Sequence, residues 1–253
     1  MSLPSHERKR PPFLTRFPFY YGWVVVAVAF VTLALGVNAR TSFSLLFPPL
    51  LDGFGWDRGV TAAAFSIGFL ASTLYAPFSG ALMDRYGPRV VLTLGVVLVS
   101  AGMAGATFIE RVWHLYLTLG VLVVGGSFFV SYFGHSLFLP NWFVRRRGLA
   151  IGIAFSGVGI SSIFFFPVMQ HVIDAVSWRE ACWILAGTLC VFLIPLNVIF
   201  QRRHPSDLNL QPDGDAASDE TEGGSAQPSN IVDPDWVAIE WTVTRALRTS
   251  RFW

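Results

Sequence analysis

Most of this sequence consists of long apolar runs joined by short charged turns. Residues 60–83 and 90–109 form two such runs, and each has the roughly 20 residues that a helix needs to cross a bilayer. Only 13% of the 253 residues are charged, whereas a soluble domain carries about 25%. In lipid, backbone N–H and C=O groups must pair within the protein, and uninterrupted apolar runs do so as helices. The sequence therefore predicts an all-α integral membrane protein.

Six apolar runs predict six transmembrane helices, which would place both termini on the same side of the membrane. We expect the first and fourth spans to end at proline, at the pair 48–49 and at Pro140, because proline cannot continue the helical hydrogen bonding. Arginine and lysine gather on the side of the termini, and the other side carries only Arg58, Arg111 and Arg179. The positive-inside rule predicts a multi-pass protein of the plasma or inner membrane with cytoplasmic termini. The expected spans are 19–47, 60–83, 90–109, 112–139, 149–172 and 181–200.

Composition divides the chain into four parts. Residues 1–18 are polar and basic and predict a cytoplasmic tail, and residues 19–203 hold the six spans. Residues 204–235 are rich in Asp, Ser, Gly and Pro, which predicts a disordered cytoplasmic linker. In residues 236–253, apolar residues recur at helical spacing among arginines. This pattern predicts an amphipathic segment at the membrane interface.

The turn between the second and third spans gathers charges and glycines. Gly80 and Gly87 would permit close approach and a sharp reversal of the chain. Asp84, Arg85 and Arg89 would lie at the cytoplasmic surface, where water solvates them. Any polytopic protein can carry a charged cytoplasmic turn. We nevertheless expect these five residues to act as gate and conformational contacts.

Arg40 is the only arginine or lysine inside an expected span. A charge at the bilayer centre costs about 2.5–3.5 kcal/mol on insertion scales, so it usually faces a cavity or a partner. Thr32, Gly36, Arg40 and Ser44 recur every four residues, which places them on one helix face. This polar face predicts that Arg40 and Ser44 contact a ligand. The alternative is that Arg40 extends to the headgroups at the edge of the bilayer.

The fourth span carries a second stripe of this kind, formed by Ser127, Ser131 and His135. His135 could bind an anion or carry a proton, although a lone histidine on such a helix is more often a packing residue. Tyr132 and Asn38 are weaker candidates for the same substrate-binding face.

The sequence offers little for other kinds of chemistry. No expected span contains a carboxylate, and no HExxH pattern is present, which argues against an intramembrane enzyme. The two cysteines, Cys182 and Cys190, lie eight residues apart on one run, too far for a disulfide on a helix. A net charge of +2 with arginines scattered among loops indicates no nucleic-acid partner. We expect no metal and no cofactor.

Two stripes of small residues predict close helix packing. They could serve packing within the six-helix unit, or a surface that slides against an external partner. The stripes are Ala64, Gly68, Ser72, Ala76 and Gly80 on the second span, and Gly148, Gly152 and Ser156 on the fifth.

Several of these motifs resemble the major facilitator superfamily. The spacing Gly80-x-Leu82-x-Asp84-Arg85-x-Gly87-x-Arg89 resembles the loop between its second and third helices. Five further stretches resemble its monocarboxylate-porter branch: 21–25 (Tyr-Gly-Trp-Val-Val), 36–43, 54–56, 142–170 and 177–179.

The resemblance implies a carrier with twelve helices in two halves, of which this chain is the first half, built from two inverted three-helix repeats. Helices one and four of such a half line the central cavity, and helices two and five pack against the other half. The branch carries small carboxylates, often with a proton, and Arg40 falls near the position of a basic residue of its first helix. The partners implied are the lipid bilayer, a small organic anion and a C-terminal six-helix half or a second chain. Residues 241–253 look like the approach to a seventh helix.

Two departures limit the resemblance. The fourth span lacks the arginine of many superfamily members, and the fifth lacks the Gly-Pro motif of drug–proton antiporters. A non-transporting scaffold or receptor-like half remains the alternative, and it does not account for the polar face around Arg40.

Overall fold

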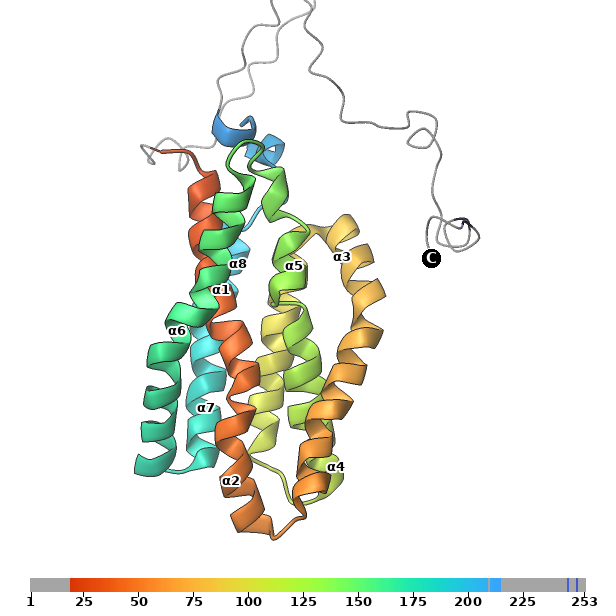
Figure 1. The fold of residues 1–253 in the computed structure, drawn as a ribbon, viewed down its shortest axis with the longest axis vertical. Helices are drawn as coiled ribbons and strands as arrows, with labels where there is room; N and C mark the ends of the chain where they lie inside the picture. The colour runs from red at the N-terminus through yellow and green to blue at the C-terminus, as the bar shows by residue number, and fades with distance from the viewer. Residues whose placement is uncertain (1–18, 209, 215–244, 246–248, 250–253) are drawn as a thin grey trace, which may run out of the picture. The chain divides into compact units, whose positions relative to one another are not determined.

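The computed structural model describes residues 19–208, 210–214, 245 and 249. Contacts divide the chain into two units, Met1–Ala216 and Ala217–Trp253, and all elements named below lie in the first. The expected tail 1–18 lies outside the described residues, as does the segment 236–253 apart from Arg245 and Thr249. Every regular element among the described residues is helical, as Figure 1 shows.

Eight α-helices are assigned in the described part of the chain, and shorter π- or 3-10-helical elements connect or extend them. The α-helices are α1 (Gly22–Thr41), α2 (Phe43–Phe54), α3 (Arg58–Ala106), α4 (Val112–Leu115), α5 (Tyr132–Ser136), α6 (Arg147–Ala175), α7 (Trp178–Thr188) and α8 (Ile194–Phe200). The other elements are η2 (Tyr116–Gly125), η3 (Gly126–Phe128), η4 (Leu139–Asn141), η5 (Leu189–Leu193), η6 (Pro205–Leu208) and η7 (Pro212–Gly214).

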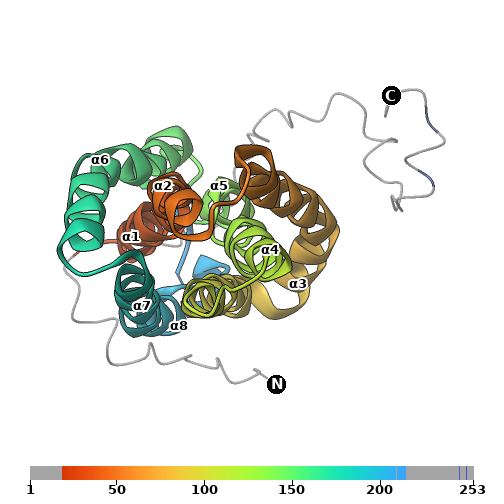
Figure 2. The same ribbon diagram turned by 90° about the horizontal axis from the view of Figure 1, so that it is seen from below.

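Five helical segments of the described residues are long and apolar enough to cross a bilayer. They are Gly22–Phe54, Arg58–Ala106, Val112–Asn141, Arg147–Ala175 and Trp178–Phe200. Seen from below in Figure 2, α1, α6 and α7 group on one side and α3, α4 and α5 on the other. Within these groups α1 packs on α6, and α3 packs on η2.

The expected second span, 60–83, and all but the last three residues of the expected third span, 90–109, fall within the single element α3. A straight helix of 49 residues would be about 74 Å long, more than twice the roughly 30 Å of a hydrocarbon core. At Gly87 the backbone leaves the helical region, with φ 75° and ψ 178°. Glycine adopts this left-handed φ without a steric penalty. Figure 1 shows the chain rising along the first part of α3 and returning along the second.

Contacts with the segment 116–130 show that the two legs of α3 run side by side in opposite directions. Both legs pass close to residues 118–120 of η2. A Cβ added to Gly68 on the first leg would lie 2.7 Å from the Gly120 carbonyl oxygen, and one added to Gly102 on the second leg would lie 2.8 Å from the Thr118 carbonyl oxygen. Further along, Phe129 lies between Tyr75, with ring centroids 5.4 Å apart, and Gly95. The reversal therefore produces a hairpin of helices clasped around η2 and η3.

The expectation that the proline pair 48–49 ends the first span is wrong. The first span is divided into α1 and α2 at Ser42, where the backbone stays in the right-handed helical region, and α2 continues through Pro48 and Pro49 as far as Phe54. Prolines are tolerated within helices of membrane proteins because neighbouring groups satisfy the freed carbonyls. The helix ends instead at Gly55, whose φ of 65° forms a left-handed C-terminal cap. As a result Asp52, expected outside the span, lies in the last turn of α2.

The fourth span is broken rather than continuous. It passes from α4 through the π-helical η2 and the short η3, and the backbone is extended at Ser131, with φ −82° and ψ −178°, before α5 begins. The Ser127 and Ser131 hydroxyls donate to the carbonyls of Val124 at 2.7 Å and Phe128 at 2.6 Å. Such local bonds compete with the regular helical ladder. Pro140 lies inside η4 and does not by itself end the span.

The segments 204–208 and 210–214 were expected to belong to a disordered linker, but they contain the turns η6 and η7. Pro205 and Leu208 are buried, and this apolar burial stabilises an ordered segment. The remaining residues of that expected linker, 215–235, lie outside the described residues.

Trp142 joins this segment to the bundle. It is fully buried, its carbonyl accepts from the Tyr20 hydroxyl at 2.8 Å, and its indole N–H donates to the carbonyl of Arg202 at 3.2 Å. The backbone N–H of Asp213 also donates to the Trp142 carbonyl, at 3.1 Å. The residue before α1, the loop before α6 and the chain after α8 therefore meet at Trp142, through its carbonyl and its indole.

The Asp213 carboxylate holds the loop before α6. Its Oδ2 accepts from the backbone N–H groups of Val144 at 2.9 Å and Arg145 at 2.8 Å. Desolvation raises the pKa of Asp213, but the backbone N–H donors of Arg145, Val144 and Arg146 and the charge of Arg145 outweigh it. Its pKa therefore lies below the usual range, so the carboxylate stays ionised and keeps these bonds at neutral pH.

The two stripes of small residues have different surroundings. Ala64 and Gly68 are buried against η2, and Ser72 donates to the carbonyls of Gly68 and Val124, so this part packs within the chain. On α6, an added Cβ at Gly148 or Gly152 would meet nothing within 4 Å. Ser156 donates to the Ile153 carbonyl on its own helix. Only 17% of the most apolar window of α6 is buried, so its outer face is open to lipid or to a partner.

Replacing Gly68 by Ala should destabilise the bundle, because the new methyl group would collide with Val124 and the Gly120 carbonyl. Overpacking of this kind costs about 1–3 kcal/mol. Gly152→Ala is the matched control: it adds the same methyl group to open space and should leave the melting temperature unchanged or raise it slightly. Melting of the purified chain in neutral detergent measures both, and equal shifts would contradict the packing described here.

Candidate functional site

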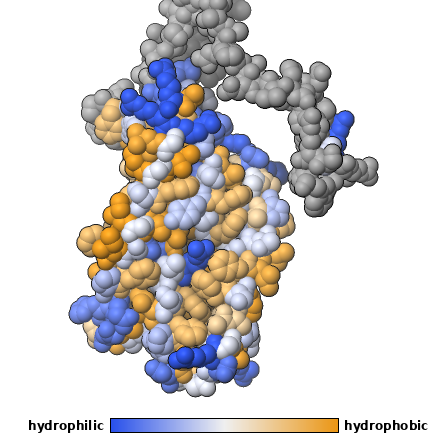
Figure 3. Space-filling view, in the orientation of Figure 1, coloured by the Kyte–Doolittle hydropathy of each residue, from blue (hydrophilic) through white to orange (hydrophobic). Residues whose placement is uncertain are grey.

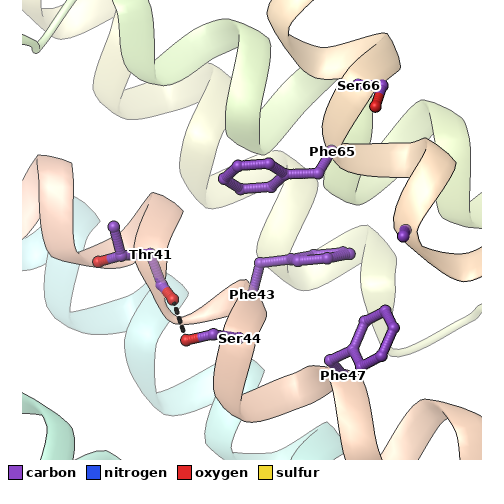
Figure 4. A pocket seen from close by; sticks show the side chains of 7 residues that line it. Thr41, Phe43, Ser44, Phe47, Phe65 and Ser66 are labelled. Atoms are coloured by element: carbon purple, nitrogen blue, oxygen red, sulfur yellow. Dashed lines mark hydrogen bonds between the residues drawn. The ribbon is translucent and has the colours of Figure 1, made fainter. Parts of the chain in front are cut away.

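A cavity of about 580 Å³ opens between α1, α2 and the beginning of α3. Its walls are mostly apolar, with three hydroxyl-bearing residues among them. Figure 4 shows the rings of Phe43 and Phe65 facing one another across it, with Phe47 beside them. The lining residues are Thr41, Phe43, Ser44, Phe47, Ala62, Phe65 and Ser66.

A series of contacts between aromatic rings connects this cavity with Arg40. The ring centroids of Phe43 and Phe65 are 5.4 Å apart, and those of Phe65 and Phe69 are 5.1 Å apart. The guanidinium carbon of Arg40 lies 5.7 Å from the centroid of Phe69. A guanidinium within about 6 Å of a ring is attracted by its quadrupole. Arg40 is therefore positioned by an aromatic ring rather than by a carboxylate.

Arg40 is half-buried, and its Nε is buried without a hydrogen-bond partner among the described residues. Tyr132 interacts electrostatically with it, and the Tyr132 ring packs on Phe155 with centroids 4.8 Å apart. Since a buried donor without a partner costs about 1–3 kcal/mol, this guanidinium is prepared to bind an acceptor. Arg40 and Tyr132, two of the expected binding residues, are brought together from α1 and α5.

The polar face expected on the first span is not continuous. The Thr32 hydroxyl donates to Asn197 Oδ1 at 3.1 Å inside the bundle, and Gly36 packs on Val130. Ser44 lies in the first turn of α2, where it donates to the Thr41 carbonyl and lines the cavity described above. Of the four residues, Arg40 and Ser44 remain near open space, because the other two face neighbouring helices.

Asn38 does not face the cavity. It is buried, and its side-chain nitrogen donates to Ser161 Oγ at 2.6 Å and to the Ala34 carbonyl at 2.8 Å. These bonds tie α1 to α6. Asn38 is therefore a packing residue in this structure rather than a free ligand-binding group.

His135 lies in the core, with no exposed surface. Its Nδ1 is 3.0 Å from the Ser131 carbonyl, and its ring is 5.6 Å from that of Phe138. Its Nε2 has no partner among the described residues. Ser131 donates to its own chain, as noted above, so the expected stripe on the fourth span does not form one exposed face.

The charged turn is tied to the chain that follows α8. Arg203 Nη2 lies 2.8 Å from Asp84 Oδ1, and its Nη1 donates to the Asp84 carbonyl. Arg89 Nε donates to the Gln201 carbonyl at 2.8 Å, and the Arg85 guanidinium lies over the Tyr86 ring. This turn is at the opposite end of the bundle from α2, as Figure 1 shows. At Gly80, an added Cβ would meet nothing within 4 Å.

The aromatic walls were missed by the sequence interpretation. Phe43 and Phe47 are four residues apart, as are Phe65 and Phe69, so each pair shares a helix face. That spacing could have indicated an aromatic cavity wall, but apolar residues at such spacing are common on any membrane helix. Among the described residues no group of three or more His, Cys, Asp or Glu side chains could hold a metal ion.

A sequence profile of the Major Facilitator Superfamily matches residues 26–253. The chain belongs to this superfamily of membrane transporters. It is 34% identical over 182 residues to monocarboxylate transporter 11 of Mus musculus, covering 72% of this chain and 40% of that protein. It is 32% identical to monocarboxylate transporter 13 of Bos taurus over 72% of this chain and 42% of the relative. Monocarboxylate transporter 12 of Rattus norvegicus is 31% identical over 89% of this chain and 45% of the relative.

These comparisons confirm the resemblance to the superfamily and to its monocarboxylate-porter branch that the motifs indicated. The chain spans about 40% of the length of monocarboxylate transporter 11. Figure 3 shows the surface expected of such a protein: one face is largely apolar, with a small hydrophilic patch at mid-height.

Proposed function

We propose that this chain forms the first half of a carrier of small organic anions, with Arg40 binding the carboxylate. The observation that carries the proposal is the half-buried Arg40 guanidinium, which has an unpaired Nε and an aromatic neighbour in place of a counter-ion. Guanidinium matches a carboxylate with two parallel hydrogen bonds. The names of the relatives support a monocarboxylate as the anion.

The layout proposed is six spans in two inverted three-helix repeats. The hairpin of α3 around Gly87 supports six spans, because its two legs contact the same segment from opposite directions. The concentration of arginine near Gly87 and beyond α8 supports a cytoplasmic position for this end and for both termini. A second six-helix unit, on the same chain or another, would complete the cavity, and the open face of α6 offers one surface for it.

Within this proposal Ser44 and Tyr132 assist Arg40. Ser44 lines the aromatic cavity, and Tyr132 is near enough to Arg40 to interact with it electrostatically. A small carboxylate held by Arg40 could therefore rest its apolar part against Phe69 and the neighbouring rings. Arg40, near mid-span, agrees with a binding site near the bilayer midplane.

Arg40→Ala should abolish most carboxylate uptake in a carrier that joins this chain to a second six-helix half. Loss of a charged hydrogen bond costs about 1.5–3 kcal/mol, which is about tenfold or more in affinity. Arg40→Lys should keep part of the activity, because the charge remains while the planar fork is lost. Uptake of labelled lactate, pyruvate and formate under a proton gradient measures the effect.

The matched control is Arg111→Ala, which removes an exposed arginine from a loop on the other side of the bundle from Gly87. Its uptake should equal that of the unmodified carrier. Unchanged uptake in a correctly inserted Arg40→Ala variant would refute the proposed role of Arg40.

Asp84→Asn should lower the rate of transport and leave substrate affinity nearly unchanged. Its carboxylate pairs with Arg203 at the membrane surface, far from the proposed midplane site. Because this pair is exposed, its contribution to overall stability should be small, about 0–1 kcal/mol. We expect Arg203→Gln to have the same effect on rate, and the double variant to lose no more than either single one. A large loss of affinity would instead place Asp84 at the substrate.

The 253-residue chain by itself should not transport. The proposed alternating access requires one bundle to rock against another around a midplane site. This chain supplies one wall of the cavity at that site. A pair of identical chains would place two copies of Arg40 around one cavity, with no buried carboxylate to balance them among the described residues. Reconstitution in liposomes with labelled lactate, pyruvate, formate and oxalate tests this. Saturable uptake of any of them would show that this unit is sufficient.

A further inference from the structure

A second pocket, of about 360 Å³, lies at the arginine-rich end of the bundle. It is formed where the hairpin turn of α3 meets the chain that follows α8. Three arginines and one aspartate contribute to its walls. The lining residues are Tyr86, Gly87, Pro88, Arg89, Arg202, Arg203 and Asp207.

The three arginines are half-buried and held by backbone carbonyls. Arg89 uses Nε to reach the Gln201 carbonyl at 2.8 Å, and Arg202 uses Nη1 to reach the carbonyls of Ile199 and Gln201, both at 2.9 Å. These bonds fix the two guanidinium groups while leaving their other N–H donors without a partner among the described residues. The pocket therefore presents prearranged positive charge.

The acidic groups nearby do not neutralise this charge. Asp84 pairs only with Arg203, and its side chain is 77% exposed, so water screens it strongly. Asp207 is exposed and accepts from the backbone N–H of His204 at 3.1 Å. Neither Arg89 nor Arg202 has a carboxylate partner among the described residues. Two half-buried guanidinium groups thus line a pocket in which the one carboxylate among the lining residues, Asp207, pairs with neither of them.

Apolar surface adjoins the pocket on both sides. Val90 follows Arg89 and is 48% exposed, and Ile199, two residues before Gln201, is 52% exposed. On the same two elements Val97 and Val198 are also exposed. A ligand bound here would therefore have its charged part among arginines and could have its apolar part along α3 and α8.

We propose that this pocket binds the phosphate group of an acidic phospholipid, whose acyl chains lie along Val90 and Ile199. Basic pockets between helices at the cytoplasmic side are suited to anionic lipid headgroups, and paired guanidinium groups match phosphate oxygens in bidentate fashion. The proposal uses the orientation proposed above and is independent of which substrate the carrier moves. Since Arg89 comes from the α3 turn and Arg202 from the chain after α8, the bound lipid would bridge both segments.

The test measures lipid binding to the purified 253-residue chain in neutral detergent by native mass spectrometry. The probes are dioctanoyl phosphatidylglycerol, dioctanoyl phosphatidylcholine and inorganic phosphate. Phosphatidylglycerol should bind at least tenfold more tightly than phosphatidylcholine. Arg89→Gln and Arg202→Gln should each weaken phosphatidylglycerol binding about tenfold, the loss expected for one charge-assisted hydrogen bond.

Two further variants make the test independent of folding defects. Asp207→Asn keeps an acceptor for the His204 N–H but removes a negative charge from the rim, and it should tighten phosphatidylglycerol binding about threefold, as expected for one unit charge in a water-like dielectric. Arg111→Gln removes an exposed arginine at the other end and should change nothing.

Three results would overturn the proposal: equal binding of the two lipids, phosphatidylglycerol binding that the variants at positions 89 and 202 leave unchanged, or a weaker affinity in Asp207→Asn. If inorganic phosphate displaces the lipid at equal concentration, the pocket recognises soluble phosphate, and the lipid assignment is wrong.

Discussion

The close approach of α3 to the segment 116–130 is the contact on which the rest of this bundle depends. Lipid provides no hydrophobic drive between helices, so association relies on tight packing and hydrogen bonds. Gly68 and Gly102 bring both legs of α3 against η2, and Gly120 lets η2 approach Ala64 in return. The reversal at Gly87 allows both contacts, because it returns the second leg of α3 to η2. One left-handed glycine and three close glycine contacts thus determine where the first half of the chain lies.

This packing decides which polar groups are available for function. Thr32 and Asn38 are, like Arg40, polar residues of the apolar helix α1. In the structure, however, Thr32 bonds to Asn197, and Asn38 bonds to Ser161. Their hydrogen bonds join α1 to α8 and to α6. Arg40 lies two residues after Asn38 on α1, at a point where the helix faces the exposed ring of Phe69. Its charge therefore remains near open space, while shorter polar side chains on the same helix are consumed by helix contacts.

The sequence predicted the helical class, the membrane spans to within several residues at most ends, and the chain reversal near Gly87. These features follow from apolar run length and glycine placement, which are local properties. The continuation of α2 through Pro48 and Pro49 was not predictable, because tolerance of proline depends on neighbours that satisfy the freed carbonyls. The break at Ser131 was missed for a related reason, since an even spacing of polar residues assumes an unbroken helix.

Among the candidate site residues, the sequence singled out Arg40 by its isolated charge and kept Asn38 as a weaker candidate, but it did not show that Asn38 packs against α6. A four-residue spacing shows that residues share a face and gives no information on which helix covers that face. The same limit applies to the ordered turns η6 and η7, where polar composition suggested disorder. There the buried Leu208 and the bonds of Asp213 to the loop before α6 supply the stabilisation that composition alone does not reveal.

The arginines near Gly87 and Arg40 in the first span are held in different ways, and the difference is electrostatic. At the end near Gly87, Arg89, Arg202 and Arg203 bind backbone carbonyls and a screened carboxylate, so their positions are fixed. Arg40 has an aromatic ring in place of these acceptors. A ring attracts a cation without satisfying its N–H donors, which keeps the group in place and still able to bind an anion. An anion that bound to Asn38 or Thr32 would instead have to break an interhelical hydrogen bond. The Arg40 guanidinium makes no such bond to a described residue through its buried Nε, so under the proposed function an anion could bind there without loosening the contacts of α1 with α6 and α8.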